Sequence, residues 1–243
     1  IVKMFVIVKA KADDGMSLPM YESYSAYAVD RLPSKKQMEK EVQRLIDIAR
    51  ALRTAPLLET YTGPAILSGR ASGVFFHEIF GHRVEGHRQK DVNSSQTFKP
   101  FLNKQILPSF INVVFDPTIK SLRGNDIVGA FEYDDDGMPG KRVVAVDSGI
   151  FRSFLMSRAP IENFPNSNGH GRRQAGFKTV SRQSNLIVEA TTTVPYDTLR
   201  AMLRRECSKQ NKEFGLLFED IQGGFTFTGR TVPNAFNVQP LVV

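Results

Sequence analysis

Two histidines and a glutamate lie close together in this sequence, in a pattern that suits metal chemistry. His77 is followed directly by Glu78, and His82 comes five residues after His77. Imidazole nitrogens are common zinc ligands, and a glutamate beside them is the usual proton acceptor for metal-activated water. These residue types predict a hydrolase in which His77 and His82 hold zinc and Glu78 acts as general base.

The spacing of the two histidines constrains the backbone that carries them. Histidines four residues apart, the common arrangement, lie about 40° from each other around a helix, whereas five residues correspond to about 140°. The rings of His77 and His82 can therefore meet only if the helix bulges or ends between them. Gly81, directly before His82, predicts such a break, because glycine enters the left-handed conformation at little cost.

Other polar residues near the motif have weaker signals. His87 repeats the five-residue spacing and is the local alternative for a further ligand. Glu85 is interpreted as a partner that orients one of the histidines. His170 is interpreted as an ordinary loop histidine. The run 134–137 lacks the ligand spacing of a calcium loop and is interpreted as a solvated turn.

Three helices are predicted from apolar residues that recur at helical spacing. Ser34 begins the first with a capping box, and its apolar stripe covers residues 38–52. The second, over about 70–80, carries the histidine motif. The third spans about 196–211 and places Cys207 on its apolar face.

Strands are predicted in much of the remaining chain, and a hairpin is predicted at Asp147-Ser148-Gly149. The expected strands are 1–8, 21–29, 65–67, 111–115, 142–146, 150–156, 185–190 and the segment from 214 on, with a break at Gly223-Gly224. This order predicts an α+β fold. We expect a large, mostly antiparallel β portion with a few flanking helices, one of which carries the histidine motif.

Composition and charge limit the class of protein. The 243 residues are 41% hydrophobic and carry a formal net charge of +7. Because the basic residues are spread along the chain, a solvated surface is favoured over a nucleic-acid partner. No apolar run approaches the roughly 20 residues that span a bilayer, so no membrane contact is expected. The single cysteine, Cys207, favours a reducing compartment, and we expect a cytoplasmic protein.

The stretch at 76–86, FHEIFGHRVEG, resembles the signature of the TldD/PmbA metalloproteases, once named modulators of DNA gyrase. Three later segments resemble further motifs of that family in the same order: DGMPG at 136–140, NGHGRR at 168–173 and QGG at 222–224. The resemblance runs from about residue 61 to the end. It favours a metal site over a chance cluster of surface histidines.

The resemblance implies roles for particular residues. His77 and His82 match the family's metal ligands, and Glu78 matches its general base. Arg172 and Arg173 are candidates for binding a carboxylate or carbonyls of the substrate, with a structural ion pair as the alternative.

The resemblance also implies an activity and partners. It implies a zinc-dependent peptidase that cleaves unfolded or extended peptides, as a homodimer or as a heterodimer with a non-catalytic homologue. The alternative is a non-catalytic binding protein that contacts DNA gyrase or nucleic acid.

The family also has a cysteine ligand near its C-terminus, in a Gly-rich loop, and this sequence stops before such a loop. Cys207 is expected to be a core residue instead. We therefore expect residues 1–60 to be the end of an upstream α/β region with one amphipathic helix. Residues 61–243 are then a catalytic, β-rich region truncated at its C-terminus. With two imidazole ligands, the chain alone is expected to bind zinc weakly and to be inactive.

Overall fold

A computed structural model describes residues 1–229 and 236–242 of the chain, which form two compact units. The first unit is built from Ile1–Ser72 and Val194–Gly223, with the described residues from Gln239 on. The second is built from Gly73–Thr193 and the described residues between Gly224 and Val238. The predicted division of the chain at residues 60 and 61 stays a prediction.

The elements confirm the predicted α+β fold. The α-helices are α1 (Lys35–Thr54), α2 (Gly69–Ile79) and α3 (Tyr196–Lys209), and short 3-10 turns cover Val29–Arg31, Gly81–Val84, Gly86–Gln89 and Lys99–Phe101. The strands are β1 (Val2–Lys11), β2 (Ser17–Ala26), β3 (Ala65–Leu67), β4 (Ile111–Phe115), β5 (Ser121–Leu122), β6 (Asn125–Asp126), β7 (Val143–Asp147), β8 (Ile150–Phe151), β9 (Gly171–Arg172), β10 (Val180–Ser181), β11 (Leu186–Ala190), β12 (Leu216–Thr226) and β13 (Phe236–Val242). The sheets are mostly antiparallel; β3 and β12 form a parallel pair. Within the described ranges, no helix is long and apolar enough to cross a membrane.

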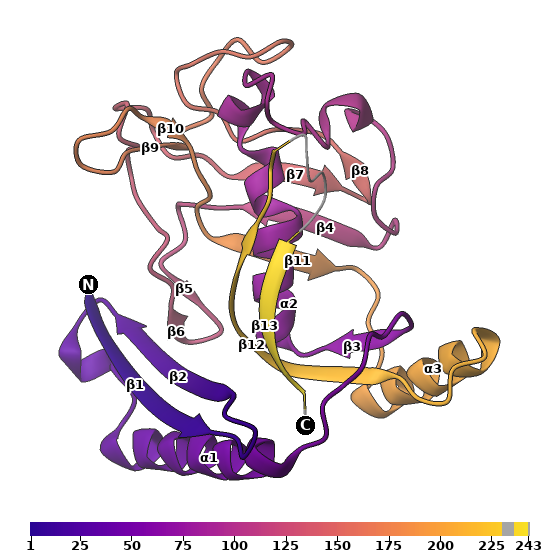
Figure 1. Cartoon of the computed structure of the whole chain (residues 1–243). Coiled ribbons are helices and arrows are strands. Elements are labelled where there is room, and N and C mark those ends of the chain that lie inside the picture. Colours follow the sequence, from indigo (N-terminus) through magenta and orange to yellow (C-terminus); the bar gives the residue numbers. More distant parts are fainter. Residues whose placement is uncertain (230–235, 243) are drawn as a thin grey trace. The chain divides into compact units, whose positions relative to one another are not determined.

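In the first unit, the hairpin of β1 and β2 packs along α1, as Figure 1 shows. The predicted capping box begins α1: the backbone N–H of Ser34 donates to Gln37 Oε1 at 2.8 Å, and the N–H of Gln37 donates to Ser34 Oγ at 3.4 Å. The apolar stripe of α1 buries Leu45 and Ala49 against Met20 of β2. Burial of this stripe holds the hairpin and the helix together.

β12 is a single strand that includes both Gly223 and Gly224, so the predicted break at these glycines is wrong. The strand lies between β13 and β3 in a three-stranded sheet. Glycine keeps its backbone donor and acceptor, so pairing with a neighbouring strand carries the strand across the two glycines.

In the second unit, a four-stranded sheet in the order β11-β4-β7-β8 supports the main core. The hairpin of β7 and β8 turns at Ser148 and Gly149, both of which have positive φ, as the predicted tight turn requires. Phe80 and Val84, which come directly after α2, are buried in this core. The residues that follow α2 are therefore anchored by apolar packing on the sheet.

The packing of α1 on the hairpin gives a first prediction. Leu45 is fully buried, so Leu45→Ala should lower the free energy of unfolding by about 2–5 kcal/mol through lost contacts and a cavity. Lys40→Ala, at an exposed position of the same helix, should change it by less than about 0.5 kcal/mol. Urea unfolding followed by circular dichroism measures both, and equal midpoints for the two variants would contradict this packing.

Candidate metal centre

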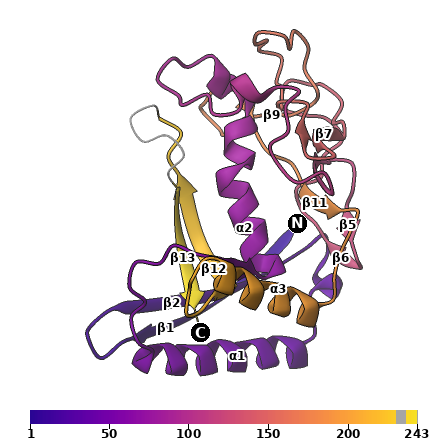
Figure 2. The same cartoon turned by 90° about the vertical axis from the view of Figure 1, so that its right-hand side faces the viewer.

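α2 ends at Ile79, and the chain continues at once into the 3-10 turn Gly81–Val84. His77 lies on the last turn of α2, and His82 lies on the 3-10 turn that follows it, visible above α2 in Figure 2. The centroids of the two rings are 4.5 Å apart, and their planes make an angle of 75°. The break that the histidine spacing predicts is therefore present, and it brings the two rings together.

The physical basis of the break differs from the predicted one. Gly81 is not among the residues with positive φ, so the predicted left-handed swing at this glycine is wrong. Glycine leaves space at this position, because a Cβ here would overlap the side-chain amide of Gln183. The turn itself is held by the burial of Phe80 before it and Val84 within it.

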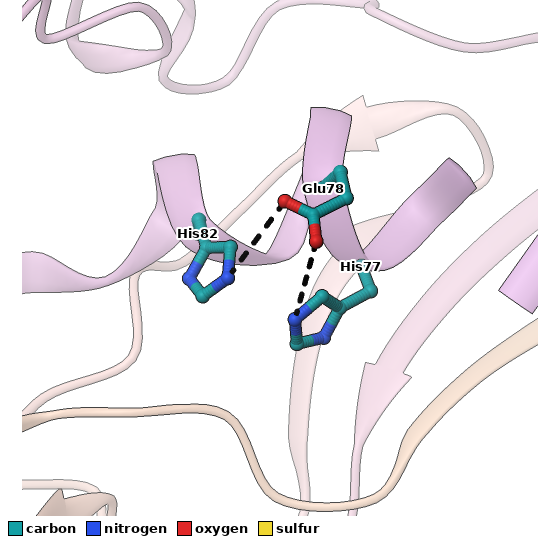
Figure 3. A group of neighbouring side chains, drawn as sticks. All are labelled: His77, Glu78 and His82. Carbon is teal, nitrogen blue, oxygen red and sulfur yellow. Dashed lines mark ion pairs between the residues drawn. The ribbon is translucent and has the colours of Figure 1, made fainter. Parts of the chain in front are cut away.

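Figure 3 shows His77, Glu78 and His82 pointing toward one another. Glu78 is buried, with Oε1 at 3.9 Å from Nε2 of His77 and Oε2 at 4.0 Å from Nε2 of His82. One ligand atom from each of the three side chains lies within 4.8 Å of the other two. Residues from a helix and from the following turn thus converge on one point.

Glu85 fixes the orientation of His82. Its Oε1 lies 3.0 Å from Nδ1 of His82, which leaves Nε2 as the ring nitrogen that faces Glu78. Arg88 donates to the other carboxylate oxygen at 2.8 Å, and Nε of Arg182 lies 3.5 Å from Oε1. Burial raises the pKa of Glu85, but the bond to His82 and the charges of the two arginines outweigh burial and lower it.

The protonation states suit metal binding and proton transfer. Burial lowers the pKa of His77, and the neighbouring His82 lowers it further, so the ring tends to stay neutral, as a metal ligand must. Burial raises the pKa of Glu78, against the effect of His82. A glutamate with a raised pKa is a stronger base than an exposed one.

These residues fit a zinc ion. Imidazole nitrogens and carboxylate oxygens are its usual protein ligands. Oε2 of Glu78 is buried and has no hydrogen-bond partner among the described residues, so a cation would compensate its burial. The Glu78 carboxylate lies 3.9 and 4.0 Å from the Nε2 atoms of His77 and His82, so it is placed beside an ion held by the two rings, where a general base for metal-activated water is needed.

The two arginines of the predicted substrate site lie on β9 and just after it. Nε of Arg172 donates to Asp135 at 3.2 Å, and its guanidinium lies 4.5 Å from the ring centre of Phe131. The backbone N–H of Arg173 donates to the same carboxylate at 2.7 Å, and its side chain is exposed. Arg172 therefore makes a structural ion pair, which was the predicted alternative to substrate binding. A role of either arginine in binding substrate stays a prediction.

The remaining candidates are structural residues or lie outside the three-residue group. His87 is not part of that group. Cys207 is a buried free cysteine on α3, which confirms its assignment to the core. His170 lies on a loop, as interpreted, but it is fully buried there, with Nε2 at 3.0 Å from Ser184 Oγ.

The predicted solvated turn at 134–137 is also wrong for its first residue. Asp134 is buried and accepts hydrogen bonds from the backbone N–H groups of Asp136, Met138 and Gly171 at 2.8–3.0 Å. A carboxylate that satisfies three backbone donors organises the surrounding loops and does not need a cation.

The structure adds a cavity that the sequence did not indicate. It measures about 440 Å³ and is lined by His77, by Gln183 and by residues that include Asp126, Leu186 and Ile187. These side chains come from α2, β6 and β11, which are far apart in the sequence. No local motif marks them, so only the fold could reveal the cavity beside His77.

Comparison with known proteins places the chain in a metallopeptidase class. A family model described as the PmbA/TldA metallopeptidase C-terminal domain matches residues 60–231. The chain belongs to this family, which confirms the predicted TldD/PmbA membership.

Individual relatives agree with this assignment. A metalloprotease of Methanocaldococcus jannaschii is 30% identical over 125 residues, which are 51% of this chain and 26% of that protein. A zinc metalloprotease TldD homologue of Saccharolobus solfataricus is 27% identical over 120 residues, 48% of this chain and 25% of that protein. The matching segment is thus about a quarter of the length of these curated relatives.

A solved structure, that of TldE from Thermococcus kodakarensis, has a similar fold. Its TM-score is 0.62 at 15% identity, over 97% of this chain and 52% of that protein. At this identity the likeness concerns the fold alone.

The burial of His170 gives a prediction about pH. Burial lowers its pKa to about 4, although the hydrogen bond to the Asn168 carbonyl raises it. In the unfolded chain the imidazole of His170 takes up a proton near pH 6.5, whereas in the folded chain it does so only near pH 4. The free energy of unfolding should therefore fall by roughly 3 kcal/mol as the pH is lowered from 6.5 to 4. Above pH 6.5 the residue is neutral in both states and contributes no pH dependence.

His170→Gln removes this titration while keeping a polar side chain. Urea unfolding at pH 7 and pH 4 should show a smaller loss of stability for the variant than for the unchanged protein. If both lose the same amount, His170 does not stay neutral in the folded state.

Proposed function

We propose that this chain carries the zinc centre of a peptidase that cleaves unfolded or extended peptides, with His77 and His82 as ligands and Glu78 as general base. The observation that carries the proposal is the convergence of these three side chains within 4.8 Å. The family supports the peptidase class, and the name of the Saccharolobus solfataricus relative supports zinc as the metal.

Zinc, when bound, would supply Lewis-acid activation of water and of the peptide carbonyl. Glu78 would accept the proton of the attacking water and pass it to the leaving amine. Burial raises the pKa of Glu78, which makes it a stronger proton acceptor than an exposed glutamate. Glu85 would keep Nε2 of His82 directed at the metal by holding Nδ1.

The cavity beside His77 supports an extended substrate. It is lined by Leu186 and Ile187 of β11, which is the outer strand of the four-stranded sheet among the described strands. A peptide added to this edge would gain backbone hydrogen bonds that do not depend on its sequence. Arg172 and Arg173 would then be further contacts for its carbonyls or its carboxylate.

Two further expectations concern a protein of the length of the curated relatives, of which the matching segment is about a quarter. A homodimer or a heterodimer with a non-catalytic homologue is testable by light scattering. Because catalytic zinc sites normally use three protein ligands, we also propose that a chain supplying one more ligand binds zinc more tightly than these 243 residues. The non-catalytic alternative would have no need of the converging His77, Glu78 and His82.

The role of Glu78 is tested by measuring peptide hydrolysis by the Glu78→Gln variant, made in a form of the protein that is active on a peptide. Activity should fall by about 10²–10⁴-fold, because an amide cannot accept the proton. Zinc content, measured by atomic absorption, should stay within about twofold, because the imidazole ligands remain. Glu132→Gln, at an exposed carboxylate of the same unit, is the matched control and should keep full activity. Retained hydrolysis by Glu78→Gln would remove this residue from the mechanism.

The metal ligands are tested separately, by calorimetric titration with zinc. His82→Ala should lose at least about tenfold in affinity because one protein ligand is removed. His87→Ala should bind as the unchanged protein does. A larger loss for His87→Ala than for His82→Ala would show that the ligands are assigned wrongly.

A further inference from the structure

Gln183 lies against both parts of the candidate metal centre. Its side-chain amide occupies the space that a Cβ at Gly81 would fill, one residue before His82. It also lines the cavity that contains His77. One side chain from a loop about a hundred residues further along the chain thus touches the turn that carries one histidine and lies beside the other.

The amide of Gln183 is buried in an incomplete hydrogen-bonding environment. Neither its oxygen nor its nitrogen makes a hydrogen bond of ordinary geometry with a described residue. Buried amides in folded proteins nearly always have partners, and an unsatisfied one needs an explanation, such as an ordered water, a further ligand or a role in a site.

The two histidines would then have matching supports. Nδ1 of His82 is held by Glu85 at 3.0 Å, which leaves Nε2 directed at Glu78. Nε2 of His77 is directed at the same carboxylate, at 3.9 Å. A metal-bound histidine normally donates its other N–H to an oxygen acceptor, which fixes the ring and its tautomer. The amide oxygen of Gln183 is suited to be that acceptor for His77.

We propose that Gln183 is a positioning residue of the metal centre: when metal is bound, its amide oxygen accepts a hydrogen bond from the ring of His77, and its packing on Gly81 holds the turn that carries His82. The inference rests on the proposed zinc site. It assigns to Gly81 the purpose of admitting this amide. It also explains why a polar side chain is buried here although described residues leave its hydrogen-bonding capacity unused.

The test measures zinc affinity by calorimetry and the visible absorption spectrum of the cobalt-loaded protein, which reports ligand geometry. Gln183→Ala should lower zinc affinity by about 10–100-fold and change the cobalt spectrum. Gln183→Glu keeps an acceptor oxygen at the same place and should restore both to near the unchanged protein. Gln174→Ala, at an exposed glutamine of the same unit, should alter neither.

A second variant keeps the inference testable if Gln183→Ala does not fold. Gly81→Ala should displace the amide and lower zinc affinity, and combining it with Gln183→Ala should cause no further loss, because both act through one contact. Independent, multiplying losses would contradict the proposed coupling.

The outcomes separate this inference from the proposed function. If Gln183→Ala binds zinc as tightly as the unchanged protein and gives the same cobalt spectrum, the role of Gln183 is overturned. The proposed zinc site is not affected by that result. Equal losses for Gln183→Ala and Gln183→Glu, with a matching fall in melting temperature, would show a purely structural residue. If the unchanged protein does not bind zinc and His82→Ala behaves in the same way, the proposed zinc site is overturned. This inference is then overturned with it.

Discussion

Two side chains five positions apart cannot share one ion from a regular α-helix, and the rest of the centre depends on how the chain meets this constraint. α2 ends at Ile79, and the tighter 3-10 turn at Gly81–Val84 rotates His82 back over His77. Such a turn has poorer hydrogen bonds than an α-helix and needs support from outside. That support comes from Phe80 and Val84, which are buried in the core beside the four-stranded sheet. The sheet therefore contributes to the site without supplying any of its three converging side chains.

Two buried glutamates on either side of this turn, Glu78 and Glu85, have opposite electrostatic environments, which separates their roles. Glu85 accepts hydrogen bonds and is surrounded by positive charge from Arg88 and Arg182, so it stays ionised and holds His82. Glu78 has one oxygen without a hydrogen-bond partner among the described residues, and burial raises its pKa. Environments that separate the pKa values of neighbouring carboxyl groups commonly divide them into a fixed structural charge and a group that exchanges protons.

Local patterns in the sequence predicted the parts of this structure that local physics determines. The capping box of α1, the end of α2 before Gly81 and the hairpin at Ser148 and Gly149 follow from capping, spacing and turn chemistry within a few residues. The wrong expectations concern contacts between distant segments. Gly81 leaves space for the amide of Gln183, and buried Asp134 accepts a hydrogen bond from the backbone of Gly171. Neither relation leaves a periodic or spacing signal, so only the tertiary fold reveals it.

The length of the segment between the histidines has a consequence for how this site can change over evolutionary time. Deleting one residue there would give the common four-residue spacing, but it would also rotate everything that follows by about 100°. Val84 would leave the core, and Glu85 would move away from Arg182. A single deletion therefore gives a chain that has the four-residue spacing but has lost the packing that now supports the turn. Changes in this turn are therefore expected to be exchanges at constant length, because one deletion does not convert one histidine spacing into a working form of the other.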